Sequence, residues 1–253
     1  MYTDNETATL KPQDGNAWAV VSNMTQHSSQ AASISAHLVE RWTRYGAPAL
    51  EAGDAISPFI TGFELQAHFL AGNATAALAL MRRQWGFMLD DARMTGSTFA
   101  EGYSVSGELH YAPYLNDARI SHAHGWATGP TSSLTAYVAG IQLRGAGGST
   151  WRVAPQLADL RFADAGFRTR LGFFAARTEV AGRGWRMVFQ APLGTSGEVG
   201  FPSVSCEGSV LVRELDGRCA DVEIAVTEEN HEAVGFVGLA GGRWEATFAC
   251  HQE

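Results

Sequence analysis

The side chains best suited to chemistry lie in one stretch of the chain, residues 96–141. Glu101 stands between Phe99-Ala100 and Gly102-Tyr103, where a carboxylate is either paired with a structural partner or poised as a general base. Gly102 has no side chain, so a ligand can approach the backbone beside Glu101. On the residues alone Glu101 is a candidate for either role, and Tyr103 is a candidate ligand contact.

A second group, His122, His124 and Trp126, comes just before a predicted helix start. Two histidines separated by one residue bind a metal only with further ligands, and neither Asp117 nor Glu101 has a recognised spacing to them. We therefore predict no metal and no other cofactor. Each histidine can instead donate a hydrogen bond to a sugar hydroxyl or be a satisfied structural residue. Trp126 can stack on a sugar ring or pack between loop and helix.

Before this stretch the apolar residues recur with helical spacing. Helices are predicted over about 16–25, 28–45, 58–71 and 73–88, joined by short polar connections like helical hairpins. Pro58 occupies the first position of the third helix after Ser57, a potential cap, and Asn73 caps the fourth. A fifth helix is predicted from Pro130, with a buried side formed by Leu134, Tyr137, Val138 and Ile141. Elsewhere, His68 is predicted in the core, and Asp117 and Arg119 as a local ion pair.

After Gly145 the apolar period falls to two, which is typical of strands with one buried face. Glycine and proline recur about every eight to twelve residues, which favours an antiparallel β-sandwich. We therefore predict two domains, a helical one over residues 1–145 and a sandwich over residues 146–253. The alternating positions are Phe167, Thr169, Leu171 and Phe173, then Trp185, Met187 and Phe189, then Val210 and Val212, then Trp244, Ala246 and Phe248.

Composition excludes several classes of function. The net charge of −8 argues against nucleic acid as a partner, because phosphate binding needs a basic surface. No apolar run of about 18 residues is present, so no membrane span is predicted. The polar start of the chain carries no signal peptide, and sequons at Asn5, Asn23 and Asn73 hint at a secreted parent without fixing the location.

The three cysteines, Cys206, Cys219 and Cys250, are an odd count without Cys-x-x-Cys spacing. This pattern supports neither a disulfide framework nor a zinc site. Cys206 and Cys219 can pair, although spacing alone does not decide it.

Several segments together resemble the C-terminal half of α-L-rhamnosidases of glycoside hydrolase family 78, especially the fungal type. They read P-Q-D-G-N, I-S-P-F-I-T-G-F-E-L-Q-A-H-F, R-R-Q-W-G-F-M, G-S-T-F-A-E-G-Y and S-H-A-H-G-W-A-T-G-P-T-S-S-L-T-A-Y-V-A-G-I. The resemblance implies the end of an (α/α)6 six-hairpin barrel followed by a C-terminal β-sandwich. It implies that Glu101 is the general base and that His124 contacts the sugar. Ala123 and Phe99-Ala100 depart from the family pattern at the sugar-facing wall.

An inverting glycosidase uses one carboxylate to activate water and a second, protonated one to assist the leaving oxygen, about 6.5–9.5 Å away. In the resembling family the acid lies upstream of anything in this sequence. The resemblance therefore implies a fragment that has the base, acts on terminal α-L-rhamnose of glycosides or polysaccharides, and has little activity alone. The missing N-terminal half of the enzyme is then a possible partner.

Two other classes stay open. A non-catalytic carbohydrate-binding or interaction fragment would hold sugar through His124 and Trp126 without chemistry. A polysaccharide lyase of the α/α toroid type would need a tyrosine or histidine base and a basic clamp, for which only Arg93 and Arg119 flank Glu101 in the sequence. An unsaturated product would identify a lyase.

Overall fold

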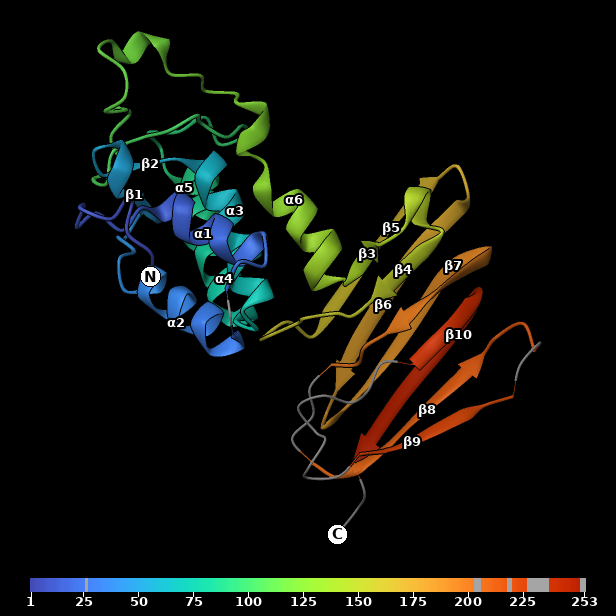
Figure 1. The fold of residues 1–253 in the computed structure, drawn as a ribbon. Helices are drawn as coiled ribbons and strands as arrows, with labels where there is room; N and C mark the ends of the chain where they lie inside the picture. Colours follow the sequence, from blue (N-terminus) through green and yellow to red (C-terminus); the bar gives the residue numbers. More distant parts are fainter. Residues whose placement is uncertain (26, 203–205, 218–219, 227–236, 251–253) are drawn as a thin grey trace. The chain divides into compact units, whose positions relative to one another are not determined.

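The structure, a computed structural model, describes residues 1–25, 27–202, 206–217, 220–226 and 237–250. It contains two compact units, Met1–Ser133 and Leu134–Glu253. The first unit is mainly helical and the second is mainly a β-sheet (Figure 1). The predicted domain boundary at residue 145 falls inside the second unit. Among the described residues, every helix is too short or too polar to cross a membrane.

The first unit is built on four main helical segments. They are α1 (Gln13–Val21), α2 (Ser28–Val39), α3 (Pro58–Leu70), and α4 (Ala74–Leu80), which continues through the π-helical turn η2 (Met81–Trp85) into α5 (Gly86–Asp90). The short strands β1 (Pro48–Ala49) and β2 (Ala55–Ile56) flank the turn η1 (Leu50–Ala52). A long loop follows, containing η3 (Asp117–Arg119) and η4 (Gly125–Ala127), and leads into α6 (Gly129–Ser133).

Two helix starts confirm the sequence signals. Pro58 is the first residue of α3, and the side chain of Asn73 caps α4 by accepting a hydrogen bond from the Ala76 N–H at 3.1 Å. Ser57 precedes α3 but makes no side-chain cap hydrogen bond. Local chemistry is therefore a reliable guide where a single residue satisfies a single backbone group.

Helix α1, Gln13–Val21, differs from the predicted 16–25 at both ends, and α2 differs from prediction at its C-terminal end. Helix α1 begins at Gln13, earlier than predicted, because Glu51 accepts hydrogen bonds from the backbone N–H groups of Gln13 and Asp14 at 2.9 and 3.0 Å. Pro12 at its N-cap cannot supply that acceptor. Helix α2 ends at Val39, so Trp42 and Tyr45 lie beyond it and do not extend its apolar stripe as the spacing predicted.

A buried polar network joins the helices around Glu64 in α3, which is 1% exposed. Its carboxylate accepts hydrogen bonds from the Gln13 amide at 2.5 Å and the Trp42 indole at 2.6 Å, and it lies 3.2 Å from Nε2 of His68. His68 is fully buried, as predicted, and its Nδ1 lies 2.7 Å from the Ser35 hydroxyl in α2. One carboxylate thus links α1, α3 and the segment that follows α2.

In the described residues of the second unit, eight strands form one sheet. Its strands are β3 (Ile141–Leu143), β4 (Thr150–Val153), β5 (Phe162–Thr169), β6 (Gly172–Ala181), β7 (Gly184–Val199), β8 (Gly208–Glu214), β9 (Val222–Val226) and β10 (Val237–Cys250). Strand β7 is the centre, with β10 along one edge. Its other edge is shared by antiparallel β6 and, at residues 196–199, by parallel β4. The sheet is therefore mixed and branched rather than purely antiparallel.

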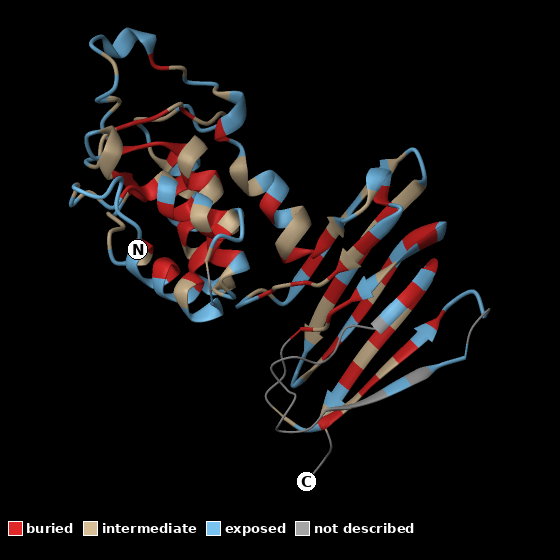
Figure 2. Ribbon diagram, in the orientation of Figure 1, coloured by how far each residue is buried: buried red, intermediate tan, exposed pale blue. Residues whose placement is uncertain are grey.

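The predicted alternation is confirmed on the long strands. Trp185, Met187 and Phe189 are buried, and the residues between them are not. Figure 2 shows buried positions alternating with less buried ones along the long strands. The same holds for the predicted positions on β8 and β10. The proposed run through Phe167 and Phe173 is instead a hairpin, since the turn at residues 170–171 separates β5 from β6 and leaves Leu171 47% exposed.

The helix predicted from Pro130 is short. Helix α6 passes into a π-helical turn, η5 (Leu134–Val138), and Ile141 already belongs to β3. Leu134 is 44% exposed, so it does not line the buried side as predicted, whereas Val138 and Ile141 are buried. Glycine at position 140, with φ of 82°, turns the backbone toward the strand.

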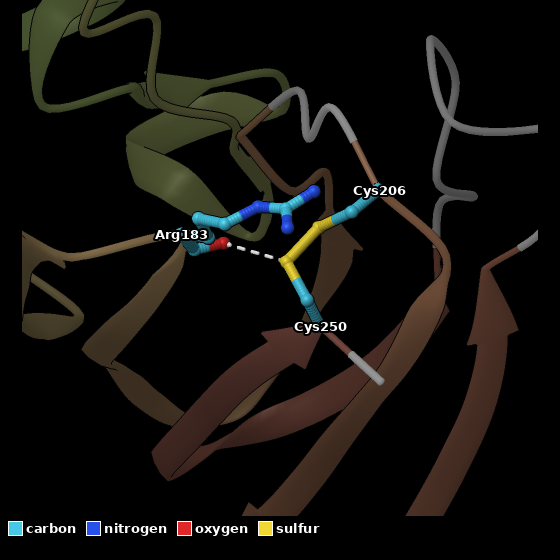
Figure 3. The surroundings of a disulfide bond; sticks show 3 residues. All are labelled: Arg183, Cys206 and Cys250. Atoms are coloured by element: carbon cyan, nitrogen blue, oxygen red, sulfur yellow. Dashed lines mark hydrogen bonds between the residues drawn. A yellow bond between two sulfur atoms is a disulfide. The ribbon is translucent and has the colours of Figure 1, made fainter. Parts of the chain in front are cut away.

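A disulfide joins Cys206 to Cys250 (Figure 3). The suggested Cys206–Cys219 pair is thus wrong for Cys206, and Cys219 lies outside the described residues. The bridge ties the segment before β8 to the last residue of β10, across 44 residues of chain. The carbonyl oxygen of Arg183, in the β6–β7 turn, lies 3.2 Å from the Cys250 sulfur.

Candidate active site

Backbone hydrogen bonds bring the segment 98–101 beside the segment 121–124. The Glu101 N–H donates to the Ser121 carbonyl at 2.8 Å, and the His124 N–H donates to the Phe99 carbonyl at 2.8 Å. The Thr98 hydroxyl adds a bond to the His122 carbonyl at 2.6 Å. The predicted carboxylate and the predicted histidines therefore lie on neighbouring segments of one loop cluster.

The Glu101 carboxylate is partly exposed and has two donors. The Tyr114 hydroxyl donates to Oε1 at 2.5 Å, and the Ser121 N–H donates to Oε2 at 3.1 Å. An ionised carboxylate accepts at both oxygens and keeps further lone pairs for another donor. The same contact raises the pKa of Tyr114, because its phenolate would face a carboxylate.

Glycine is required at position 102 for a reason that differs from the predicted approach of a ligand. A Cβ at this position would lie 2.3 Å from the ring of Tyr111, so the ring takes the space that the sequence suggested for a ligand. Tyr111 in turn packs edge-on against Tyr114, with ring centroids 5.4 Å apart. Glycine at 102 therefore allows the tyrosine pair to approach, and Tyr114 can then reach Glu101.

His124 and Trp126 act as a pair. The Trp126 indole N–H donates to Nε2 of His124, and an indole N–H can only donate. In this contact Nε2 of His124 is the acceptor, so Nδ1 is the ring atom left for a ligand. Trp126 is 62% exposed and stacks on Phe59 of α3, with centroids 4.6 Å apart.

The close approach of α3 and α6 allows the Trp126 ring to stack on the Phe59 ring. A Cβ at Gly129 would lie 2.6 Å from the Cα of Gly62, so these glycines let the two helices touch through their backbones. The Trp85 indole donates to the Ala127 carbonyl at 2.7 Å and so holds η4, the turn just before α6. Sequence reasoning missed Phe59, Tyr114 and Ser121 as parts of this site.

Two other predictions need correction. Tyr103 has no exposed surface, its hydroxyl donates to the Tyr45 carbonyl at 2.8 Å, and burial raises its pKa. It is a core residue and cannot meet a ligand from solvent. Asp117 pairs with His110 at 3.0 Å rather than with Arg119, and this hydrogen bond lowers the pKa of Asp117.

His122 is exposed, and no hydrogen bond or ion pair of its ring is present in the described part of the chain. It lies two residues before His124 in the same loop segment. Among the described residues, no three His, Cys, Asp or Glu side chains gather as metal ligands would. The chemistry available here is that of a carboxylate, an imidazole and an exposed indole.

The Arg93 guanidinium holds the loop segment around Glu108 near Asp91. It bonds Asp91 at 2.8 Å and Glu108 at 3.2 Å, and it lies over the rings of Tyr45 and Phe87. Arg93 holds the pKa of Asp91 at about 2. The residue that the sequence offered as half of a basic clamp is thus already paired.

Solved structures similar to this one are α-L-rhamnosidases. The enzyme from Dictyoglumus thermophilum aligns with a TM-score of 0.70 and 14% identity, over 96% of this chain and 26% of its own. The Streptomyces avermitilis enzyme, complexed with L-rhamnose, and the Aspergillus terreus enzyme both align at 0.68 and 17%, over 97% and 99% of this chain and 22% and 25% of theirs.

The sequence matches no protein-family model and no curated protein. At these identities the likeness concerns the fold, and it extends over both units. The chain spans about a quarter of the length of the rhamnosidases it resembles. Its fold is therefore that of one part of a family 78 α-L-rhamnosidase, as the sequence motifs implied, while bacterial and fungal types are not distinguished.

Proposed function

We propose that this chain provides the general-base side of an α-L-rhamnosidase active site, acting on terminal α-L-rhamnose with inversion. Glu101 is the base. The observation that supports this most is the pairing of segment 98–101 with segment 121–124, since it gathers a carboxylate, an imidazole and an indole in one loop cluster. The fold of the similar solved structures points to the same chemistry.

In the proposed reaction Glu101 accepts a proton from a water molecule, which attacks the anomeric carbon from the face opposite the leaving oxygen. The Tyr114 hydroxyl and the Ser121 N–H hold the carboxylate in position through one lone pair on each oxygen. The remaining lone pairs are free to take the water proton.

The sugar is held by the neighbouring pair. With Nε2 of His124 occupied by the Trp126 indole, the Nδ1–H of the ring is left to donate to a rhamnose hydroxyl. The exposed face of Trp126, backed by Phe59, offers an apolar platform for the sugar ring. His122 is a further proposed donor at the rim.

The general acid belongs to the opposite wall of the (α/α)6 barrel, which we propose is formed by a part of the enzyme outside this chain. It would stand about 6.5–9.5 Å from Glu101, so that water fits between the carboxyl groups. This chain with its own residues alone is then expected to hydrolyse very little.

The test uses 4-nitrophenyl α-L-rhamnoside. The chain alone should release little or no nitrophenol, and strong release would contradict a missing acid. In a polypeptide that joins this chain to the acid-bearing part, Glu101→Gln should lower kcat by about 10²–10⁴-fold or more while the KM changes little. Unchanged turnover in that variant would exclude Glu101 as the base.

A second candidate, sugar binding without hydrolysis, is favoured by one observation. Trp126 exposes 62% of its surface although it is stacked and hydrogen-bonded, as a binding platform would be. Calorimetry with L-rhamnose separates the two candidates when it is combined with the hydrolysis assay in the joined polypeptide. Retained binding with no turnover there would favour the binding role.

A further inference from the structure

The second unit has a depression of about 400 Å³ on the solvent side of its sheet. Strands β5, β6, β7 and β10 lie side by side in the sheet (Figure 1). Residues of all four strands line the depression. Its outward residues alternate with buried ones, so this side is the one opposite the apolar core (Figure 2). Nothing in the proposed hydrolytic site uses it.

The register explains why the surface is hollow here. Val188 of β7 lies opposite Arg177 of β6 and Glu245 of β10, and Ala175 of β6 lies opposite Gln190 of β7. Two short side chains are thus surrounded by long polar ones. The floor of the depression is apolar and its rim is polar, which is the usual composition of a small-ligand site.

Two of the three arginines at the rim are paired with carboxylates. Arg177 pairs with Asp164 at 3.5 Å and with Glu179 at 2.5 Å, and Arg186 pairs with Glu245 at 2.5 Å. Asp164 lines the depression, and the other two carboxylates lie beside its lining. The paired arginines offer little free charge to an ion, whereas an uncharged molecule with many hydroxyl groups meets both donors and acceptors.

Two rim side chains have no partner of their own. Arg243 and Gln190 stand opposite each other on β10 and β7, both exposed. Within the described residues neither side chain makes a hydrogen bond or an ion pair. A guanidinium and an amide are flat groups with paired hydrogen-bonding atoms, which suit two adjacent hydroxyls of one sugar ring.

Aromatic rings extend the same face. Phe162 of β5 is 48% exposed and lies under Arg177, whose guanidinium carbon is 4.8 Å from the ring centroid. Phe173 of β6 lies under Arg168 at 5.4 Å. Register puts both rings on the side of Ala175 and Arg177, so further sugar units would meet aromatic surface.

We propose that this face is a separate carbohydrate-binding site for an uncharged oligosaccharide. Arg243 and Gln190 bind the hydroxyls of one ring, over the apolar floor of Val188 and Ala175. The site is independent of Glu101, and its role is to hold the chain on a glycan. This binding site would serve a hydrolytic fragment and a non-catalytic fragment equally.

The test is a titration of the full chain with cellohexaose, mannohexaose and galactohexaose, followed by calorimetry and by NMR of the Gln190 side-chain amide. At least one neutral hexasaccharide should bind and shift that amide. Arg243→Ala and Gln190→Ala should each weaken binding by about tenfold, equivalent to about 1.4 kcal/mol. The matched control is Arg170→Ala, which removes another exposed arginine, in the β5–β6 turn, and should leave binding unchanged.

Three results would overturn the proposal. They are the absence of binding by all three sugars, equal losses in Arg170→Ala and Arg243→Ala, and tighter binding of hexagalacturonate or inorganic phosphate through Arg243. The last result would identify an anion site instead. Because Glu101→Gln should keep hexasaccharide binding intact, the outcome is read separately from that of the hydrolysis assay. Circular dichroism of each variant shows whether it is folded.

Discussion

In the helical unit, buried side-chain hydrogen bonds join many segments that are far apart in sequence, beside a few backbone bonds, whereas in the sheet unit backbone ladders join most of them. Glu64, Glu51 and the Tyr103 hydroxyl each bridge separate segments of the first unit. In the second unit, β7 and β10 pair from Trp185 to Val199 with one irregularity. The two units therefore depend on different kinds of residue.

This difference has an energetic consequence. Removing one acceptor from a side-chain network leaves several buried donors unsatisfied, and each costs about 1–3 kcal/mol. Removing a side-chain hydroxyl from a sheet leaves the ladder intact. The loops that carry the candidate site belong to this first unit, where the Thr98 and Tyr114 hydroxyls add side-chain hydrogen bonds to the backbone bonds between the loop segments.

The largest expected effect is at Glu64. Glu64→Leu keeps the volume but leaves the Trp42 indole, the Gln13 amide and His68 without their acceptor, so the helical unit should lose about 3–5 kcal/mol of stability. Hydrogen exchange of peptides from α1 and α3 measures the loss within that unit.

The matched control is Thr178→Val in β6. Thr178 is 1% exposed, and its hydroxyl has no hydrogen-bond partner among the described residues. Its replacement should change the stability of the sheet unit by less than about 1 kcal/mol, or raise it. A loss as large as that of Glu64→Leu would end the contrast between the units.

The disulfide gives the next effect. Reduction, or the double variant Cys206→Ser with Cys250→Ser, frees a 44-residue segment and should lower the stability of the sheet unit by about 2–4 kcal/mol. Urea unfolding followed by exchange in both units measures this. If exchange in α1 and α3 rises equally, the two units do not unfold separately.

The smallest expected effect concerns pH. The lowered pKa of Asp91, about 2, means that its pair with Arg93 contributes stability above the unfolded-state pKa of about 3.9, and that this contribution is lost as pH falls toward 2. A carboxyl NMR titration should place the Asp91 midpoint near 2. Arg93→Gln should return it toward 3.8, the ordinary value, and an unmoved midpoint would refute the pairing.

Sequence patterns correctly predicted those structural features that depend only on residues close together in the sequence. Pro58, Asn73 and the alternation of Trp185, Met187 and Phe189 each report on neighbouring residues, and the structure agrees. The end of α2 was missed because Trp42 bonds Glu64, a residue far along the chain. A helical spacing cannot reveal that competition.

The candidate site was predictable only in part. Residue types and the family resemblance singled out Glu101, His124 and Trp126, and their chain segments do lie together. Tyr114 was missed because its approach to Glu101 depends on the packing of Tyr111 over Gly102. Tyr103 was misassigned because an aromatic residue beside a candidate base reads the same whether it faces solvent or core.

The most direct test of the account is an NMR titration of the labelled chain with L-rhamnose. The account predicts saturable shifts of the Ser121 amide, whose N–H bonds Glu101, and of the Trp126 indole N–H, which bonds His124. Shifts confined to the sheet unit, or none in residues 98–126, would contradict a sugar site around Glu101.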